Sequence, residues 1–270
     1  MTRPDWTPPD IDLSRPSVAR MYDYNLGGSH NFEIDRTYAR HLNETVPDLP
    51  TVHRANRSQL RRVVRFFAEM GIRQFLDIGS GIPTVGNVHE IAQRAAPGSR
   101  IVYVDIDVVA VTHSNAILAD NDLAAAVQAD ARNASGILSD PTVRSLIDFN
   151  EPVGVLMLAV LHFIVDEDDL TDAMHTYREA MCPGSYLAIS HPTAEGKTGE
   201  RIKASVVVSS RHQVDTKLRG SAELIQMFEG FDILEPGVVF TPAWRPDSPD
   251  DYFHDEPDRS ATITAVGVKR

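Results

Sequence analysis

Short apolar runs recur along the chain and predict the strands of a sheet. The first run contains Phe75, Leu76 and Ile78, and the second spans residues 101–104. Runs this short without polar interruption are typical of strands that are buried on both faces. Further runs with strand character lie at residues 125–129, 153–158, 186–190, 231–234 and 261–268. We therefore expect a sheet of seven strands.

Segments with helical periodicity separate the strands between residues 74 and 191. This alternation predicts an α/β fold, Rossmann-like in type, with a mostly parallel sheet and helices on both faces. The segment between the sixth and last strands holds no helix long enough for a parallel crossover. The last strand should therefore run antiparallel.

A helix is predicted over residues 51–70, where Leu60, Val64 and Phe67 share one apolar face. Five arginines lie largely off this face, and we expect them to face solvent: Arg54, Arg57, Arg61, Arg62 and Arg65. The same helix opens the second of two regions. Residues 1–50 are predicted to be an N-terminal extension or lid, and residues 51–270 the main domain.

The N-terminal region is unusually rich in Tyr, Asn, Gly and His between residues 15 and 36. Residues 1–15 carry many Pro and Asp residues and should be loosely held. Ser14 is a candidate cap for a short helix that ends at the glycine pair 27–28, and Ser29 or Asn31 is a candidate start for the next. This region either covers a crevice as a lid or simply packs on the sheet.

The turn after the first strand has the pattern Asp-x-Gly-x-Gly, formed by Asp77, Gly79 and Gly81. Glycines let the backbone turn tightly and approach a ligand closely. A dinucleotide site needs a third small residue, but Thr84 occupies that position. A carboxylate at Asp77 would repel a pyrophosphate but would suit an ammonium group. The pattern favours S-adenosylmethionine (SAM), although a plain strand-to-helix turn is the alternative.

Two further carboxylates follow neighbouring strands. Asp105 ends the second strand, 26 residues after Gly79, where a carboxylate can hydrogen-bond a ribose diol. Its alternative role is to cap the next helix, but Asp107 fits that role better. Asp130 follows the third strand, where it could accept a hydrogen bond from an adenine amino group or be an ordinary loop residue.

Composition excludes several classes of protein. The net charge of −12 argues against a dominant nucleic-acid surface, because phosphate binding depends on clustered Lys and Arg. Cys182 is the single cysteine, so neither an internal disulfide nor a Cys-based zinc site is expected. His89 and Glu90 resemble a zinc motif only in part, because Gln93 stands where a second His is needed. Lacking a signal-like or membrane-spanning apolar run, the chain is expected to be cytoplasmic.

The order of these motifs resembles that of class I SAM-dependent methyltransferases, over about residues 50–270. A narrower likeness covers nearly the whole chain. The segments RPSVARMYDYNLGGSHNFEIDR, FLDIGSGIPTVGNVHEIAQ, VYVDID, VLHFIVDEDD and GSYLAISHPT resemble a bacterial methyltransferase family formerly labelled a domain of unknown function. The resemblance implies a seven-stranded sheet with a reversed last strand, and SAM as cofactor.

The resemblance also implies cofactor contacts at particular residues. Gly79 and Gly81 would lie under the methionine moiety, Asp105 on the ribose, Ile106 against the adenine and Asp130 near its amino group. We add five further candidates for cofactor contact: Asp77, Ala131, Ala159, Tyr22 and Asn31. Pro83 departs from the broad pattern, because many methyltransferases have a third glycine there.

His162 is the first candidate for a catalytic base, because it follows the strand beside the cofactor and imidazole titrates near neutral pH. A structural hydrogen-bonding role is its alternative, and His191 is a weaker candidate. The favoured function is methyl transfer to a small-molecule acceptor. A non-catalytic SAM-binding sensor or interaction protein is the second hypothesis, and an NAD-dependent oxidoreductase the third. No metal, nucleic-acid or membrane partner is expected, and the sequence leaves the acceptor and the oligomeric state open.

Overall fold

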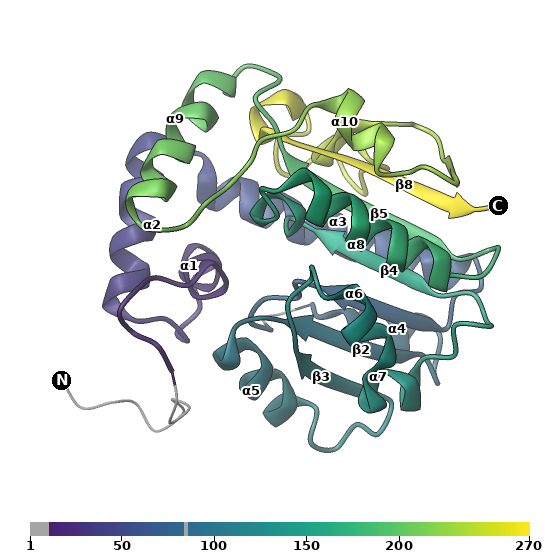
Figure 1. The fold of residues 1–270 in the computed structure, drawn as a ribbon. Coiled ribbons are helices and arrows are strands. Elements are labelled where there is room, and N and C mark those ends of the chain that lie inside the picture. The colour runs from purple at the N-terminus through teal and green to yellow at the C-terminus, as the bar shows by residue number, and fades with distance from the viewer. Residues whose placement is uncertain (1–10, 84–85) are drawn as a thin grey trace.

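Five parallel strands form the centre of the molecule (Figure 1). The computed structural model describes residues 11–83 and 86–270. Thr84, which occupies the third position of the glycine pattern, lies outside the described residues, as does Val85. Most of residues 1–15, which we expect to be loosely held, also lie outside them. The parallel strands are β1 Gln74–Ile78, β2 Arg100–Asp105, β3 Ala124–Gln128, β4 Gly154–Leu158 and β5 Tyr186–Pro192.

The strand order is β3-β2-β1-β4-β5-β8-β6, so the chain reverses direction across the sheet at β1 and β4. The last part of the sheet is built by β6 Phe231–Ile233, β7 Val239–Phe240 and β8 Thr262–Lys269. As predicted, β8 runs antiparallel to β5, and it also pairs antiparallel with β6 and β7. The expected number of seven strands is one too few, because β7 pairs through only two residues and leaves no periodic signal.

Helices cover both faces of the sheet, and successive strand residues point to opposite layers. Phe75 packs with α3 Leu49–Glu69, α4 Val88–Ala95 and the end of α5 Val108–Ile117. Leu76 packs on the other face. That second layer is built by α6 Ala134–Ser139, α7 Pro141–Leu146, α8 Glu167–Ala180 and α10 Ser221–Gln226. Three short 3-10 helices complete the chain: η1 Leu161–Phe163, η2 Thr241–Ala243 and η3 Pro257–Ser260.

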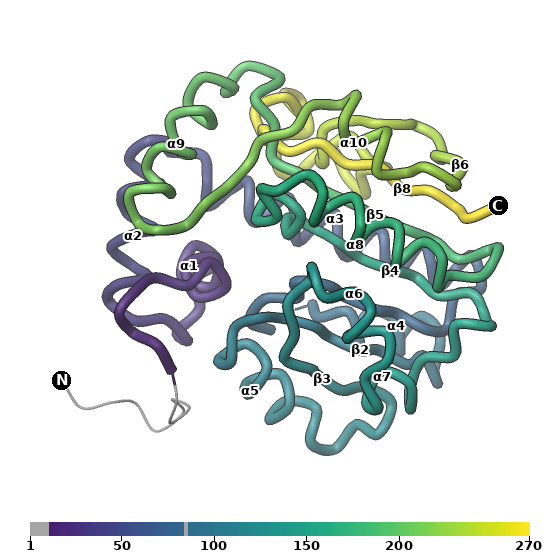
Figure 2. The backbone as a smooth tube through the Cα atoms, viewed as in Figure 1, coloured from purple at the N-terminus to yellow at the C-terminus, as the bar shows by residue number. Residues whose placement is uncertain are grey.

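Three helices form a cap beyond the carboxyl ends of the parallel strands (Figures 1 and 2). They are α1 Val18–Asn25, α2 Glu33–Thr45 and α9 Gly199–Arg211. α2 packs against both α1 and α9, and α1 also contacts α3. The cap therefore joins the N-terminal region to a segment about 170 residues later in the chain, which the sequence did not indicate.

The starts of the two cap helices differ from the prediction. Ser17, rather than Ser14, caps α1, and its Oγ accepts a hydrogen bond from the Arg20 amide at 3.4 Å. α2 begins at Glu33, later than Ser29 or Asn31, because the Asp35 carboxylate accepts the Phe32 amide hydrogen at 2.9 Å. The predicted cap of α5 is confirmed, because Asp107 accepts two amide hydrogens at the start of this helix.

The arginines of α3 do not all face solvent. Arg62 is only 3% exposed. Its Nε donates to the Trp244 carbonyl at 3.0 Å, and one Nη donates to the Thr241 carbonyl at 2.9 Å. Arg62 therefore fastens the segment around η2 onto α3, and the interpretation of this residue as solvent-facing is wrong. Arg61 and Arg65 are exposed, as expected.

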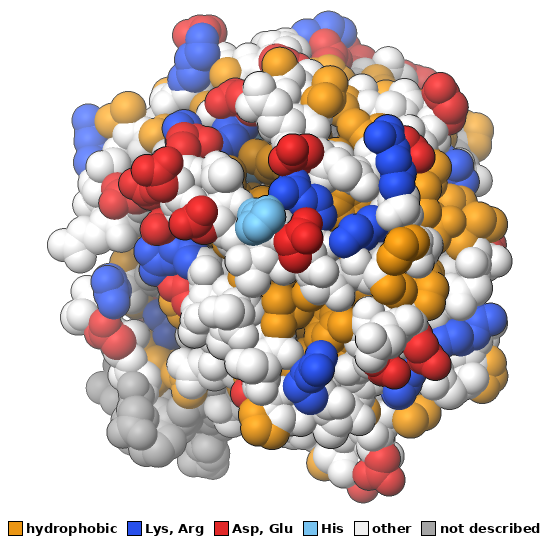
Figure 3. Space-filling model, turned by 45° about the vertical axis from the view of Figure 1, so that its right-hand side comes forward, with side chains coloured by type: hydrophobic (Ala, Val, Ile, Leu, Met, Phe, Trp, Pro, Cys, Tyr) orange, Lys and Arg blue, Asp and Glu red, His pale blue; other side chains and the backbone are white. Residues whose placement is uncertain are grey.

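The surface shows no sign of a single dominant charge on the face drawn in Figure 3, where acidic and basic side chains are interspersed. Within residues 11–83 and 86–270, no helix is both long enough and apolar enough to cross a membrane.

We predict that Arg62→Met lowers the free energy of unfolding by about 2–4 kcal/mol, because two buried carbonyls lose their donor. Urea denaturation would measure the change. Arg61→Met, one residue away on the exposed side of α3, is the matched control and should change stability by less than about 0.5 kcal/mol. Equal stability of the two variants would contradict the role assigned to Arg62.

Candidate functional site

The register of β1 and β2 brings their carboxyl ends together. Ile78 pairs with Val104, so Asp77 near the end of β1 and Asp105 at the end of β2 lie at the same edge of the sheet. Beyond the strands, the Gly79 amide donates to the Val104 carbonyl at 2.7 Å. The turn predicted from the glycines is therefore continuous with the ladder between the two strands.

The two glycines of this turn have different roles. Gly79 has φ +73°, and a Cβ there would lie 2.3 Å from Cγ2 of Val160. Gly81 has φ +66°, but a Cβ there would meet no described atom within 4 Å, and Gly81 lines a cavity. A side chain is excluded at Gly79 by the protein itself. The open space is at Gly81, where the backbone can approach a ligand.

Asp105 holds the turn in place. One carboxylate oxygen accepts the Gly81 amide hydrogen at 2.7 Å, and the other accepts the Asp107 amide hydrogen at 2.8 Å. Each carboxylate oxygen can accept a second hydrogen bond, so the group retains the capacity to bind hydroxyls. Asp107 caps α5, as predicted, so Asp105 is not needed as the cap of that helix.

Burial perturbs both carboxyl groups at this edge. It raises the pKa of Asp77 to about 7, against an opposing effect of Arg57. Burial likewise raises the pKa of Asp105 to about 6, although hydrogen bonds from the Asp107 and Gly81 amides oppose the shift. Two buried carboxyl groups with raised pKa values are poised to gain stability from a ligand that brings an ammonium group or hydroxyl donors.

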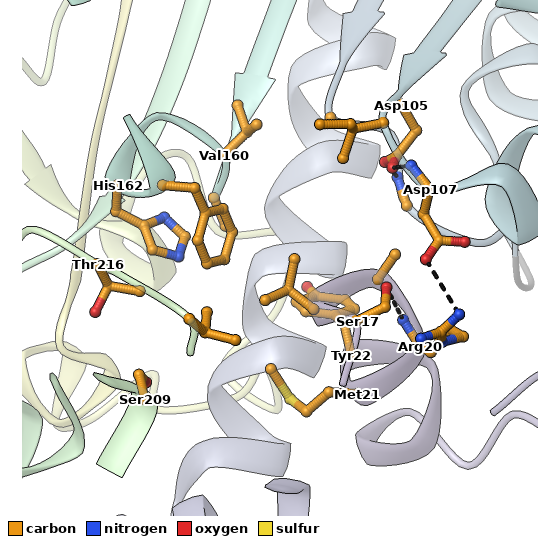
Figure 4. A pocket seen from close by; sticks show the side chains of 18 of the residues that line it. Ser17, Arg20, Met21, Tyr22, Asp105, Asp107, Val160, His162, Ser209 and Thr216 are labelled. Atoms are coloured by element: carbon orange, nitrogen blue, oxygen red, sulfur yellow. Dashed lines mark hydrogen bonds and ion pairs between the residues drawn. The ribbon is translucent and has the colours of Figure 1, made fainter. Parts of the chain in front are cut away.

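A cavity of about 740 Å³ opens beside these carboxyl groups. Figure 4 shows Asp105 and Asp107 on one side of it and His162, Thr216 and Ser209 on the other, with side chains of α1 between them. The volume lies within the range of about 300–1,000 Å³ that is typical of small-molecule sites. The cavity thus extends from the strand ends into the space beneath the cap.

Most predicted cofactor residues line this cavity. Ile106 is 60% exposed at its edge, and Ala131 and Ala159 contribute short side chains to its wall. Asp130 also lines it, but its carboxylate is held by Arg132, whose Nε lies 3.0 Å from both oxygens. This hydrogen-bonded pair lowers the pKa of Asp130, so the carboxylate stays charged and already has a partner.

Tyr22 and Asn31 differ in position. Tyr22 lines the cavity, stacks on His53 and donates its hydroxyl hydrogen to the His53 carbonyl at 3.0 Å. Asn31 is not among the described residues that line the cavity. Its amide donates to Asp23 at 2.8 Å and to the Gly28 carbonyl at 3.0 Å. The structure therefore places Asn31 in the turn between α1 and α2, away from the predicted contact.

His162 lies in η1 at the cavity wall, and its ring is 3.8 Å from that of Phe163. Burial lowers the pKa of His162 well below its ordinary value, so the imidazole is neutral at pH 7. Its Nδ1 is buried and has no hydrogen-bond partner among the described residues. A neutral imidazole with an unused nitrogen can accept a hydrogen bond from a ligand hydroxyl.

His191 is held in a structural network instead. Its Nδ1 donates to the Pro192 carbonyl at 2.8 Å, and Nε2 accepts from Arg219 at 3.2 Å. Arg219 also donates to the carbonyls of Leu161 and Ile164, at 3.2 and 2.8 Å. This buried arginine fixes the loop that carries His162, and no pattern in the sequence pointed to it.

Arg20 was also missed by the sequence analysis. It is buried in α1, 3.0 Å from the carboxylate of Asp35 and 3.7 Å from that of Asp107. It therefore links α1 to the start of α2 and to the start of α5. Only its place in an unusually polar segment could have suggested a special role. In the part of the chain that the structure describes, no group of three or more His, Cys, Asp and Glu side chains could hold a metal ion.

Comparisons with known proteins identify the family of this chain. The family model described as S-adenosyl methyltransferase matches residues 4–270. A search of curated proteins found no match. A candidate methyltransferase from Thermobifida fusca has 39% sequence identity and a TM-score of 0.92, over 99% of this chain and 100% of that chain.

Two other solved structures have a similar fold. A DUF574 family protein from Streptomyces avermitilis has 38% identity and a TM-score of 0.90, over 96% of this chain and 99% of that one. The N-methyltransferase NodS from Bradyrhizobium japonicum shares 13% identity with a TM-score of 0.50, over 82% and 98% of the two chains, which shows the fold alone. The family match over nearly the whole chain decides the assignment: this chain belongs to the S-adenosyl methyltransferase family and is a SAM-dependent methyltransferase.

Proposed function

We propose that the protein transfers the methyl group of SAM to a small-molecule acceptor held beneath the cap. The observation that carries the proposal is one continuous cavity, with Asp77 and Asp105 at one end and His162 at the other. Such a cavity can hold two small molecules with their reacting groups adjacent. A volume of about 740 Å³ suits a small acceptor beside the cofactor.

We assign the cofactor end from the chemistry of its side chains. Asp77 would pair with the ammonium group of SAM, Asp105 would accept hydrogen bonds from the ribose diol, and Ile106 would cover the adenine. Gly81 leaves room for the methionine moiety. SAM itself supplies a methyl group that is already activated on a sulfonium sulfur. Asp130 is already paired with Arg132, so we expect it to contribute less to binding of the adenine amino group than the sequence suggested.

The protein's own contribution is alignment and exclusion of water. Correct alignment of two reactants can lower a barrier by about 7–11 kcal/mol. α1 and α2 would act as the lid over the site, together with α9. His162 is the proposed acceptor of the proton that an acceptor hydroxyl gives up, because its imidazole is neutral and lines the cavity. A weak base is sufficient because an attacking hydroxyl becomes strongly acidic as methyl transfer proceeds.

The two alternative functions receive no support. A non-catalytic SAM sensor has no feature in its favour, since the family is one of enzymes and the cavity extends beyond the space at the glycine turn. The NAD-dependent oxidoreductase also conflicts with a buried carboxyl group at Asp77, which would disfavour a pyrophosphate.

The acceptor class is tested by fractionating a cell extract by size and incubating each fraction with the protein and SAM. We expect S-adenosylhomocysteine (SAH) to form with the low-mass fraction. Turnover only with the protein or nucleic-acid fraction would contradict a small-molecule acceptor. His162→Phe should lower the rate with the low-mass fraction without changing the affinity for SAH.

Asp105→Asn should weaken SAH binding about 10- to 100-fold, because charge-assisted hydrogen bonds to the ribose contribute about 1.5–3 kcal/mol. Isothermal titration calorimetry would measure the affinity. Asn retains one oxygen that can accept the Gly81 amide hydrogen, so the turn should persist. Asp120→Asn, an exposed position at the far end of α5, is the control for loss of one charge. Unchanged affinity in Asp105→Asn would remove the ribose assignment.

Binding of SAH should strengthen as pH rises. Burial raises the pKa of Asp77 to about 7 and of Asp105 to about 6, so the free protein favours neutral carboxyl groups and loses stability as the pH rises from their ordinary pKa, about 4, to these values. The ligand favours the charged forms, so binding releases protons. We expect affinity to rise about 10-fold or more between pH 5.5 and pH 7.5.

Calorimetry in buffers of different ionisation enthalpy would count the protons released. Asp77→Asn cannot ionise at that position, so the variant should release fewer protons and show a flatter pH dependence. An affinity that is constant over this range, or an unchanged proton count in Asp77→Asn, would exclude the proposed role of the carboxyl group.

A further inference from the structure

The part of the cavity beneath the cap has an apolar wall. One stripe of α9 faces it, formed by Ile202, Ser205, Val206 and Ser209. These positions are spaced by three, four and seven residues from the first, which places them on one face of a helix. Val207, between them, is 52% exposed on the outside. Met21 and Leu42 of the other two cap helices contribute further apolar surface.

Aromatic rings are concentrated at the same end. Tyr22 is stacked on His53, with 4.1 Å between ring centroids, and both residues line the cavity. His162 and Phe163 form a second ring pair at the opposite wall, and Tyr38 lines the cavity from α2. Aromatic rings on the walls of the cavity favour a flat, ring-shaped ligand.

Two titratable side chains at this end, His53 and Tyr38, carry no charge at neutral pH. Burial lowers the pKa of His53 to about 3 and raises that of Tyr38 to about 12, and the Tyr38 hydroxyl donates to Ser209 at 2.9 Å. Among the described lining residues from α2, α9 and residues 213–218, Asp215 alone is charged, and it is exposed. Arg57 of α3 also lines the cavity, but it acts on Tyr22 and Asp77. On the side formed by α2, α9 and residues 213–218, an anionic ligand would lose its hydration without gaining an ionic partner.

We propose that this chamber, lined by Tyr22, Val206 and His162, binds an uncharged aromatic acceptor whose hydroxyl group donates a hydrogen bond to His162. The inference rests on the proposed function in one respect: the ligand is the methyl acceptor only if the protein methylates a small molecule. The chamber's preference for a neutral ring is a property of binding. It can therefore be measured without turnover and separately from the cofactor end.

The test compares three ligands that share one ring system: 2-naphthol, 2-naphthoate and naphthalene. Each is titrated into the protein saturated with SAH and observed by NMR or calorimetry. We expect 2-naphthol to bind at least ten times more tightly than 2-naphthoate. Comparable or tighter binding of the anion would overturn the proposal.

Two variants locate the site. Val206→Trp should fill the chamber and weaken 2-naphthol binding at least 10-fold while leaving SAH affinity unchanged. Val207→Trp, the matched control on the outer face of α9, should change neither. Equal effects of the two variants on 2-naphthol would overturn the location.

His162→Phe tests the hydrogen bond to the ligand hydroxyl without filling the chamber. In the unmodified protein 2-naphthol should bind more tightly than naphthalene, and in His162→Phe the two affinities should become similar. An unchanged ratio would exclude the hydrogen bond to His162. Failure of the proposed function is distinguishable, because it would appear as turnover only with the protein or nucleic-acid fraction, whereas naphthol selectivity is measured as binding without turnover.

Discussion

The hydrogen bond from the Gly81 amide to the Asp105 carboxylate connects the parts of this protein on which the rest of the site depends. This hydrogen bond, 2.7 Å long, joins the turn after β1 to the end of β2. The two strands are already paired in register up to that point. Parallel strands in register must end at one edge of the sheet, so the two aspartates cannot separate. The position of the cavity follows from that constraint.

Ion pairs and carbonyl contacts then fix the cap relative to this edge. Arg20 stands between Asp35 and Asp107, and so couples the two N-terminal helices to the start of α5. On the opposite side, Arg219 holds the loop that carries His162. Both arginines are buried among oxygen atoms, where removing either would leave several acceptors unsatisfied. Buried contacts therefore hold α1, α2 and the loop of His162 at this edge of the sheet.

Burial of ionisable groups in the site lowers the stability of the free protein, and a bound ligand can offset this loss. Asp77 and Asp105 are buried where the charged form is disfavoured, and His162 is buried where protonation is disfavoured. The two carboxyl groups lower the stability of the free protein near neutral pH, whereas His162 does so only at lower pH, where the unfolded chain binds a proton there. Such groups interact strongly with a matched partner in a region of low dielectric. If the cofactor binds at Asp77 and Asp105 as we propose, stability of the empty protein and affinity for the cofactor oppose each other at the same side chains.

The sequence by itself determined the elements formed by local patterns: the buried strands, the glycine turn, the Asp107 cap and the reversed last strand. It also placed Asp77 and Asp105 together, because parallel strands share an edge. It could not place Arg62, Arg219 or α9, or show that Asn31 turns away from the cavity. Those outcomes depend on contacts between residues far apart in the chain, such as the Tyr38 hydroxyl on Ser209. Only tertiary packing decides which polar side chains of a helix are buried, because periodicity marks apolar faces and carries no signal for a paired charge.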